Sequence, residues 1–146
     1  MVATREEERL RTYMWVLFFL HLAGTVFYAL APHVFIRALN WTTAVIPLPP
    51  HPVPAERFWS IMAATMEAML MICYLEVAKD VRRNIHYLRV LVLPGKLMTF
   101  LLFLLGFLLH IHSFAYLIGF LVDFGLFVSI LYGYVRTNRS WLQATQ

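Results

Sequence analysis

Four long apolar stretches divide the chain, and they constrain its fold more than any other feature. They cover residues 13–31, 58–77, 90–109 and 114–135. The hydrocarbon core of a bilayer is about 30 Å thick, and about 20 helical residues cross it. Each stretch is therefore expected to form a membrane-spanning helix, and residues 1–146 are expected to form a single all-α membrane domain.

The composition argues against other classes of protein. Hydrophobic residues make up 61% of the 146 residues and charged residues 14%, whereas soluble domains average about 45–50% and about 25%. A chain this small could not bury so much apolar surface in water. Nucleic-acid binding fits as poorly, although the net charge is +4. The expected surroundings are the lipid bilayer.

Lysine and arginine lie mostly on one side of the predicted spans. Cytoplasmic loops are enriched in these residues, and nine of the twelve fall before the first span, between the second and third, or after the fourth. The nine are Arg5, Arg9, Arg11, Lys79, Arg82, Arg83, Arg89, Arg136 and Arg139. The other side has Arg37 and Arg57. The sequence predicts an antiparallel four-transmembrane-helix bundle with both termini cytoplasmic.

The outer loop 40–56 is rich in proline, which favours extended polyproline conformation and resists helix. Its prolines are Pro47, Pro49, Pro50, Pro52 and Pro54. Such a loop is expected to act as a stiff strap across the helix ends. It serves either as a plain connector or as a surface on which a partner docks.

Each predicted span carries an ionisable residue near the middle of the membrane. They are His21, Glu67, Lys96 and Asp123, and a rise of about 1.5 Å per residue places them in one slab. A charge at the bilayer centre costs about 2.5–3.5 kcal/mol, so pairing or neutralisation is required. We expect Lys96 to pair with Asp123 or Glu67. The cluster is either a buried ion pair that fixes helix register, or a relay for protons or ions, or a polar anchor for a lipid-like ligand.

Two further patterns concern helix packing and bending. Gly125, Ser129 and Gly133 repeat at the four-residue spacing that lets helices approach closely in membranes. This face is expected to pack against a helix of another subunit or of the same chain. Pro94 and Gly95 precede Lys96, and because proline frees a backbone carbonyl, they predict a hinge there.

The sequence offers no catalytic motif and no metal site. Cys73 is the only cysteine, which excludes an internal disulfide or a CxxC site. His110 and His112 are too few ligands for a structural metal and lie far along the chain from His21. No cofactor is predicted. A quinone, or a haem held by His21 from each copy of a homodimer, is kept as an alternative.

Residues 57–135 resemble the DoxX-like small bacterial membrane proteins. The matching residues are Trp59, Arg82, Arg83, Lys96 and Asp123. The resemblance implies a four-helix membrane fold in the bacterial inner membrane, and an association with quinone-linked redox complexes. It does not assign catalytic residues.

Three functions are compatible with these patterns. The first is a non-catalytic subunit or scaffold that packs with other membrane subunits, or with copies of itself, in a larger and redox-associated assembly. The second is a small proton- or ion-coupled carrier that uses His21, Glu67, Lys96 and Asp123. The third is a membrane protein that binds quinone or haem.

Overall fold

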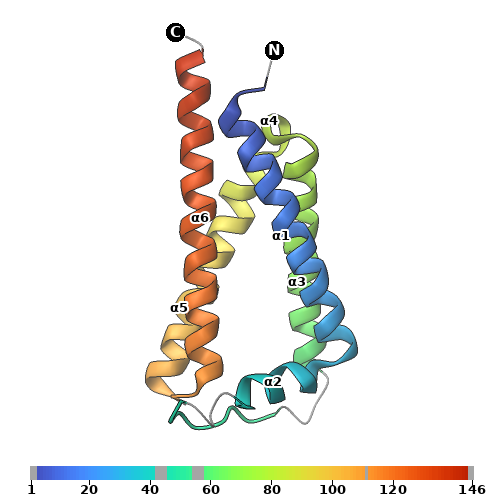
Figure 1. Cartoon of the computed structure of the whole chain (residues 1–146), viewed down its shortest axis with the longest axis vertical. Coiled ribbons are helices and arrows are strands. Elements are labelled where there is room, and N and C mark those ends of the chain that lie inside the picture. The colour runs from blue at the N-terminus through green and yellow to red at the C-terminus, as the bar shows by residue number, and fades with distance from the viewer. Residues whose placement is uncertain (1–2, 42–45, 54–57, 111, 145–146) are drawn as a thin grey trace.

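The fold was examined in a computed structural model, in which residues 3–41, 46–53, 58–110 and 112–144 are described. Within these residues the regular structure is helical. Four helical segments are long and apolar enough to cross a membrane. The helices are α1 (Arg5–Leu30), α2 (Pro32–Trp41), α3 (Phe58–Lys79), α4 (Val81–Asn84), α5 (Leu93–Leu109) and α6 (Phe114–Ala144) (Figure 1).

The first and last helices extend beyond the apolar stretches that predict them. Helix α1 begins at Arg5 rather than near residue 13, because Thr4 Oγ1 accepts a hydrogen bond from the backbone N–H of Glu7 at 3.2 Å. Three glutamates in its first turn complement the helix dipole. Helix α6 continues past residue 135 to Ala144. Both extensions lie at the end of the molecule that carries the two termini (Figure 1).

The helices form two pairs that meet at one end and separate toward the other. Helix α1 packs along α3, and α5 packs along α6. The buried core lies where the pairs meet, and includes Met14, Tyr74, Val77, Leu88 and Ile130. We call this region, with the termini and α4, the closed end. Helix α2 crosses the opposite, open end (Figure 1).

A buried carboxylate ties three segments together at the closed end. Glu7 is only 4% exposed. Its Oε2 accepts hydrogen bonds from Arg82 Nε at 2.9 Å and from Trp141 Nε1 at 3.2 Å. Thr4 and Ser140 add a hydroxyl–hydroxyl bond of 3.1 Å beside it. These contacts hold α1, α4 and α6 together, so this end of the bundle is closed by polar bonds as well as by apolar packing.

The third membrane-length segment, Val81–Leu109, contains an irregular turn shortly before Pro94 and Gly95, which themselves lie in the first turn of α5. Residues Leu88–Val92 form a π-helical turn, and the N–H of Leu93 bonds to the carbonyl of Leu88. Proline cannot donate a backbone hydrogen bond, so the irregular turn lies directly before Pro94. A Cβ added at Gly95 would meet no atom of the described residues within 4 Å. Gly95 is thus not required for close packing.

The connection at the open end differs from the predicted loop. Residues 40 and 41 belong to α2, so the proline-rich loop begins later than residue 40. Helix α2 was not predicted, because it is shorter than an apolar stretch that crosses a membrane. Residues 46–53 are non-helical, as the prolines predict, whereas Pro54 lies outside the described residues. We call residues 46–53 the strap. The Asn40 side chain holds it by donating a hydrogen bond to the His51 carbonyl at 2.8 Å and accepting one from the His51 N–H at 2.7 Å.

Candidate functional site

Lys96 and Asp123 form a buried ion pair between α5 and α6. Lys96 Nζ lies 2.7 Å from Asp123 Oδ1, and the two residues are 3% and 8% exposed. Of the two carboxylates considered as partners for Lys96, the structure therefore selects Asp123. Within the apolar part of the bundle, the positive charge of one residue thus neutralises the negative charge of the other.

His21 and Glu67 form a second, looser pair between α1 and α3. His21 Nε2 lies 3.7 Å from Glu67 Oε2, which is longer than a hydrogen bond. The other ring nitrogen, Nδ1, lies 2.9 Å from the Leu17 carbonyl oxygen. The His21 ring also meets the Tyr74 ring edge-on, with 4.8 Å between centroids. The histidine is therefore fixed on both sides, while Glu67 is not.

The two pairs belong to one electrostatic cluster. The charges of Lys96 and Asp123 act on both His21 and Glu67. The four residues come from four different helices, and each helix pair supplies one ionisable pair. The cluster lies between the core of the closed end and the space at the open end.

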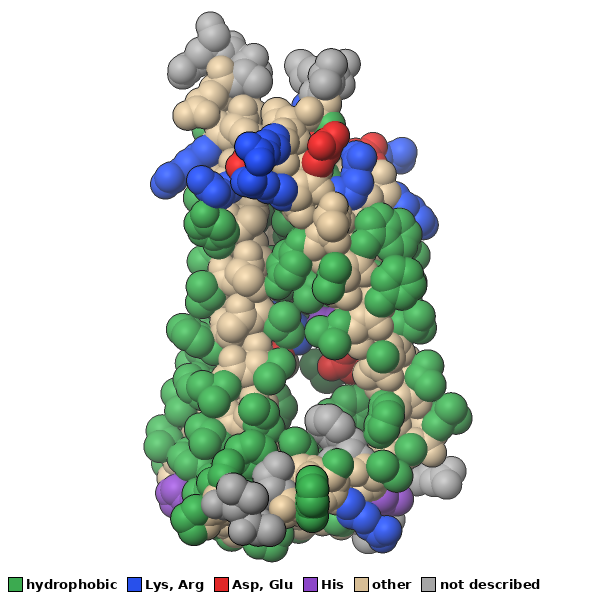
Figure 2. Space-filling view, viewed as in Figure 1, with side chains coloured by type: hydrophobic (Ala, Val, Ile, Leu, Met, Phe, Trp, Pro, Cys, Tyr) green, Lys and Arg blue, Asp and Glu red, His purple; other side chains and the backbone are tan. Residues whose placement is uncertain are grey.

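The space between the separated helix pairs is a cleft. A cavity of about 440 Å³ reaches from the strap and α2 to the two carboxylates. Its lining is Tyr28, Ile36, Leu39, His51, Glu67, Phe103, Ala115, Tyr116, Ile118, Gly119, Val122 and Asp123. Figure 2 shows the hollow between the two helix pairs, with acidic side chains beside it.

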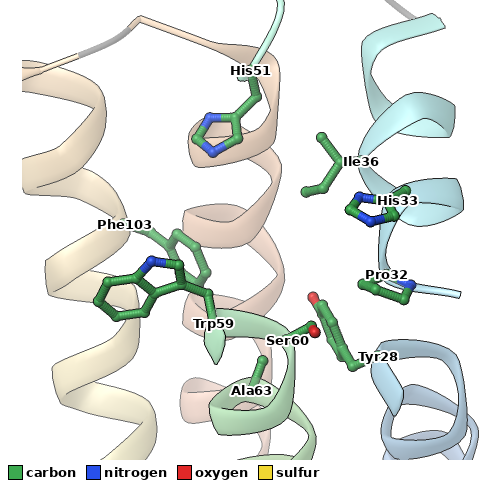
Figure 3. Close-up of a pocket in the computed structure, with 9 residues that line it drawn as sticks. All are labelled: Tyr28, Pro32, His33, Ile36, His51, Trp59, Ser60, Ala63 and Phe103. Atoms are coloured by element: carbon green, nitrogen blue, oxygen red, sulfur yellow. The ribbon is translucent and has the colours of Figure 1, made fainter. Parts of the chain in front are cut away.

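A second cavity, of about 300 Å³, adjoins the first beneath α2. The two share Tyr28, Ile36, His51 and Phe103, so we treat them as one cleft. Figure 3 shows side chains from α1, α2, α3, α5 and the strap around this part. The walls are mainly apolar and aromatic, and the charged groups of the lining are at the inner end.

The outer mouth of the cleft is organised by His51. Its Nδ1 lies 3.1 Å from the hydroxyl of Ser113, which is fully buried. Its ring meets the Tyr116 ring edge-on, with 4.9 Å between centroids. Burial lowers the pKa of His51 below its ordinary value, because burial disfavours the charged imidazolium. The strap therefore presents a neutral imidazole to the cleft at neutral pH.

The small-residue face on α6 packs partly within the chain. Ser129 Oγ lies 2.6 Å from the Tyr13 hydroxyl, and a Cβ at Gly133 would lie 3.1 Å from Leu10. Both contacts are made with α1. A Cβ at Gly125 would meet no described atom within 4 Å. Two of the three positions thus serve packing inside the chain.

Two cleft residues have no signal in the sequence. His51 in the strap and Phe103 on α5 come from distant segments, and no local pattern distinguishes them from other histidines and phenylalanines of the chain. Among the residues that the structure describes, no group of three or more histidine, cysteine, aspartate or glutamate side chains could hold a metal ion.

Comparison with known proteins gives no relative for this arrangement. No protein-family model matches the chain, and neither curated proteins nor solved structures include a match.

Proposed function

We propose that this chain is a four-span membrane protein whose cleft binds a membrane-soluble amphipathic small molecule. The observation that carries the proposal is the combination of apolar walls with Glu67 and Asp123 at the inner end of a cavity of about 440 Å³. Small-molecule sites commonly have volumes of about 300–1,000 Å³, apolar linings and a few convergent polar groups.

The proposed orientation puts both termini in the cytoplasm and the spans antiparallel. Lysine and arginine side chains gather at the closed end (Figure 2), as the positive-inside rule requires of a cytoplasmic side. The cleft then opens in the outer half of the bilayer. The resemblance to DoxX-like proteins favours the bacterial inner membrane as the location.

The polar end of the cleft would decide which molecule binds. Lipid tails are as apolar as the cleft walls, so apolar contact alone gives little preference for a ligand over lipid. A hydrogen-bonding or charged group in a low-dielectric site interacts much more strongly than in water. Selection would therefore come from Glu67 and the charged groups beside it.

Native mass spectrometry of the gently extracted protein tests this proposal. Wild-type protein is expected to carry a discrete bound mass of small-molecule size. Ala115→Phe, which fills the larger cavity, should remove that mass. The matched control Ala23→Phe adds the same side chain at an exposed position of α1 and should retain it. Equal ligand occupancy in both variants would contradict the proposal.

A proton- or ion-coupled carrier is the second candidate. It is favoured by two ionisable pairs at the inner end of the cleft, where the core of the closed end blocks further passage. Such a carrier would also have to open the closed end during transport. Flux into reconstituted vesicles should be lost in Lys96→Met and in Asp123→Asn; flux that persists in both would contradict it.

Membership in a larger, redox-associated assembly remains a separate prediction. Gly125 is the part of the small-residue face that an additional helix could use, since no described atom lies within 4 Å of its Cβ position. Native mass spectrometry would reveal other polypeptides or further copies of the chain, and a visible spectrum would reveal haem. A colourless monomer without bound polypeptides would contradict this role.

A further inference from the structure

Building on the function proposed above, we infer that the cleft takes a cationic amphiphile, with its protonated amine at Glu67 and its apolar body toward the open end. The inference adds a ligand class and an orientation to the proposed binding site. It follows from the unequal way in which the two carboxylates of the cleft are neutralised.

Asp123 already pairs with a lysine, whereas no lysine or arginine among the described residues pairs with Glu67. Asp123 is bound by Lys96 Nζ at 2.7 Å. Within the described part of the chain, the partner of Glu67 at ion-pair distance is His21, at 3.7 Å, and neither lysine nor arginine approaches it so closely. Lys96 is held on Asp123. The cluster therefore carries one excess negative charge whenever Glu67 is ionised and His21 is neutral.

The tautomer of His21 prevents it from supplying a proton to Glu67 while neutral. A contact of 2.9 Å to the Leu17 carbonyl requires an N–H on Nδ1, because a carbonyl oxygen only accepts. Neutral His21 then presents the lone pair of Nε2 toward Glu67 Oε2. Two acceptors face each other, so a hydrogen-bond donor from outside the pair is favoured at this position.

Glu67 is placed to receive such a donor. Its side chain is 28% exposed, unlike the buried Asp123, and it lines the cleft. On the α1 side the carboxylate faces Gly24, where a Cβ would make an ordinary van der Waals contact of 3.4 Å with Glu67 Oε2. The carboxylate therefore has the access to the cleft that an incoming ammonium group needs.

A buried hydroxyl lies next to His21 on the core side of the cluster. Tyr74 is fully buried, and its hydroxyl has no hydrogen-bond partner among the described residues. It lies close enough to Glu67 and Asp123 for their charges to act on it, and its ring touches His21. Buried hydroxyls nearly always have a partner, but Tyr74 belongs to the core of the closed end and does not line the cleft, so its hydroxyl adds to the polar character of the inner end without contacting a ligand.

The remaining walls suit the apolar body of the ligand. Between Asp123 and Tyr116, helix α6 rises by roughly 10 Å, which accommodates an alkyl chain of about eight carbons. Aromatic rings of Tyr28, Phe103 and Tyr116 line the same space. Their faces attract cations as well as apolar groups, so they could guide an ammonium group inward.

The test compares two probes that differ in charge. Octylamine and octanol, whose chains match the length of the apolar walls, are titrated into phosphatidylcholine nanodiscs that hold the full chain, at pH 7, with empty nanodiscs subtracted as background. Wild-type protein is expected to bind the amine saturably and at least tenfold more tightly than the alcohol. Glu67→Gln should weaken amine binding at least tenfold and leave alcohol binding unchanged. Glu67→Asp, which keeps the charge, should retain part of the preference.

Two results would overturn the inference, and they differ in what they say of the proposed function. Equal binding of amine and alcohol, unaffected by Glu67→Gln, would leave a binding cleft without the cationic preference. Absence of saturable binding for both probes would overturn the inference, and absence of a co-purified mass would then contradict the binding function as well.

Discussion

Lys96 Nζ on α5 lies 2.7 Å from Asp123 Oδ1 on α6, while the other two ionisable residues of the cluster stand 3.7 Å apart on α1 and α3. Lys96 and Asp123 are both buried, whereas in the looser pair only His21 is buried and the half-buried Glu67 is open to the cleft. This asymmetry assigns different physical roles to carboxylates that look equivalent in the sequence. The pair on α5 and α6 stabilises packing, and the carboxylate on α3 is available to a ligand.

The first prediction concerns the stability of the buried pair. Lys96→Met leaves Asp123 as a buried charge without a cation, so the free energy of unfolding should fall by about 3–5 kcal/mol. The double variant Lys96→Met with Asp123→Leu removes both charges and should regain most of this loss. Unfolding of the purified protein in detergent measures both. If the double variant loses as much free energy of unfolding as the two single variants together, the two residues are not coupled.

The second prediction concerns the polar contacts at the closed end. Glu7→Gln weakens the hydrogen bonds from Arg82 and Trp141 to a buried carboxylate, so unfolding should become easier by about 1.5–3 kcal/mol. Glu8→Gln changes an exposed neighbour in the same turn and is expected to cost less than about 0.5 kcal/mol. Thermal unfolding of the two variants side by side checks the difference. Similar losses would mean that net charge, rather than the buried contacts, matters at this end.

The third prediction concerns glycines on tightly and loosely packed faces. A Cβ at Gly106 would lie 2.7 Å from the Tyr116 ring, so Gly106→Ala should destabilise the α5–α6 pair by about 1–3 kcal/mol. Gly125→Ala meets no described atom within 4 Å and should be neutral or stabilise by up to about 1 kcal/mol. Chemical unfolding in detergent compares them. A loss at Gly125 instead would indicate a neighbouring helix on that face.

The fourth prediction is a pH dependence that comes from His51. Burial lowers its pKa in the folded protein, so between that value and the ordinary value of about 6.5 the unfolded chain binds more protons. His51 therefore contributes stability above about pH 6.5, and this contribution falls as the pH drops below that value. The unfolding midpoint should decrease from pH 7.5 to pH 5.

The matched control for this pH dependence is a histidine on the surface. His51→Gln should flatten the change between the two pH values, whereas His86→Gln, at an exposed position, should leave it as in wild type. An unchanged slope in His51→Gln would assign the pH dependence to other groups.

Hydropathy and charge predict the helices well, because burying about 20 apolar residues in lipid is a property of each segment by itself. Thr4 and the glutamates after it likewise show why α1 starts early. Helix α2 is too short to stand out by hydropathy, and its position depends on contacts with the strap through Asn40 and His51. Local patterns do not encode such contacts.

The sequence predicts that four ionisable residues lie at one depth, but it does not predict how they divide into pairs. Depth along each helix brings His21, Glu67, Lys96 and Asp123 to one level, since helical rise is fixed. The choice of Asp123 over Glu67 by Lys96 depends on α5 packing against α6 rather than α3. The separation of the two helix pairs, which makes the cleft, is a three-dimensional outcome of the same packing.

Photo-crosslinking in native membranes tests the central claim that the cleft holds a defined small molecule. p-Azidophenylalanine replaces Phe103 in the cleft, or Phe27 on an exposed face of α1, so that only an azide is added to each ring, and the adduct masses are measured after irradiation. The account predicts one discrete adduct of small-molecule mass at position 103 and a mixture of phospholipid adducts at position 27. The same phospholipid mixture at both positions would contradict it.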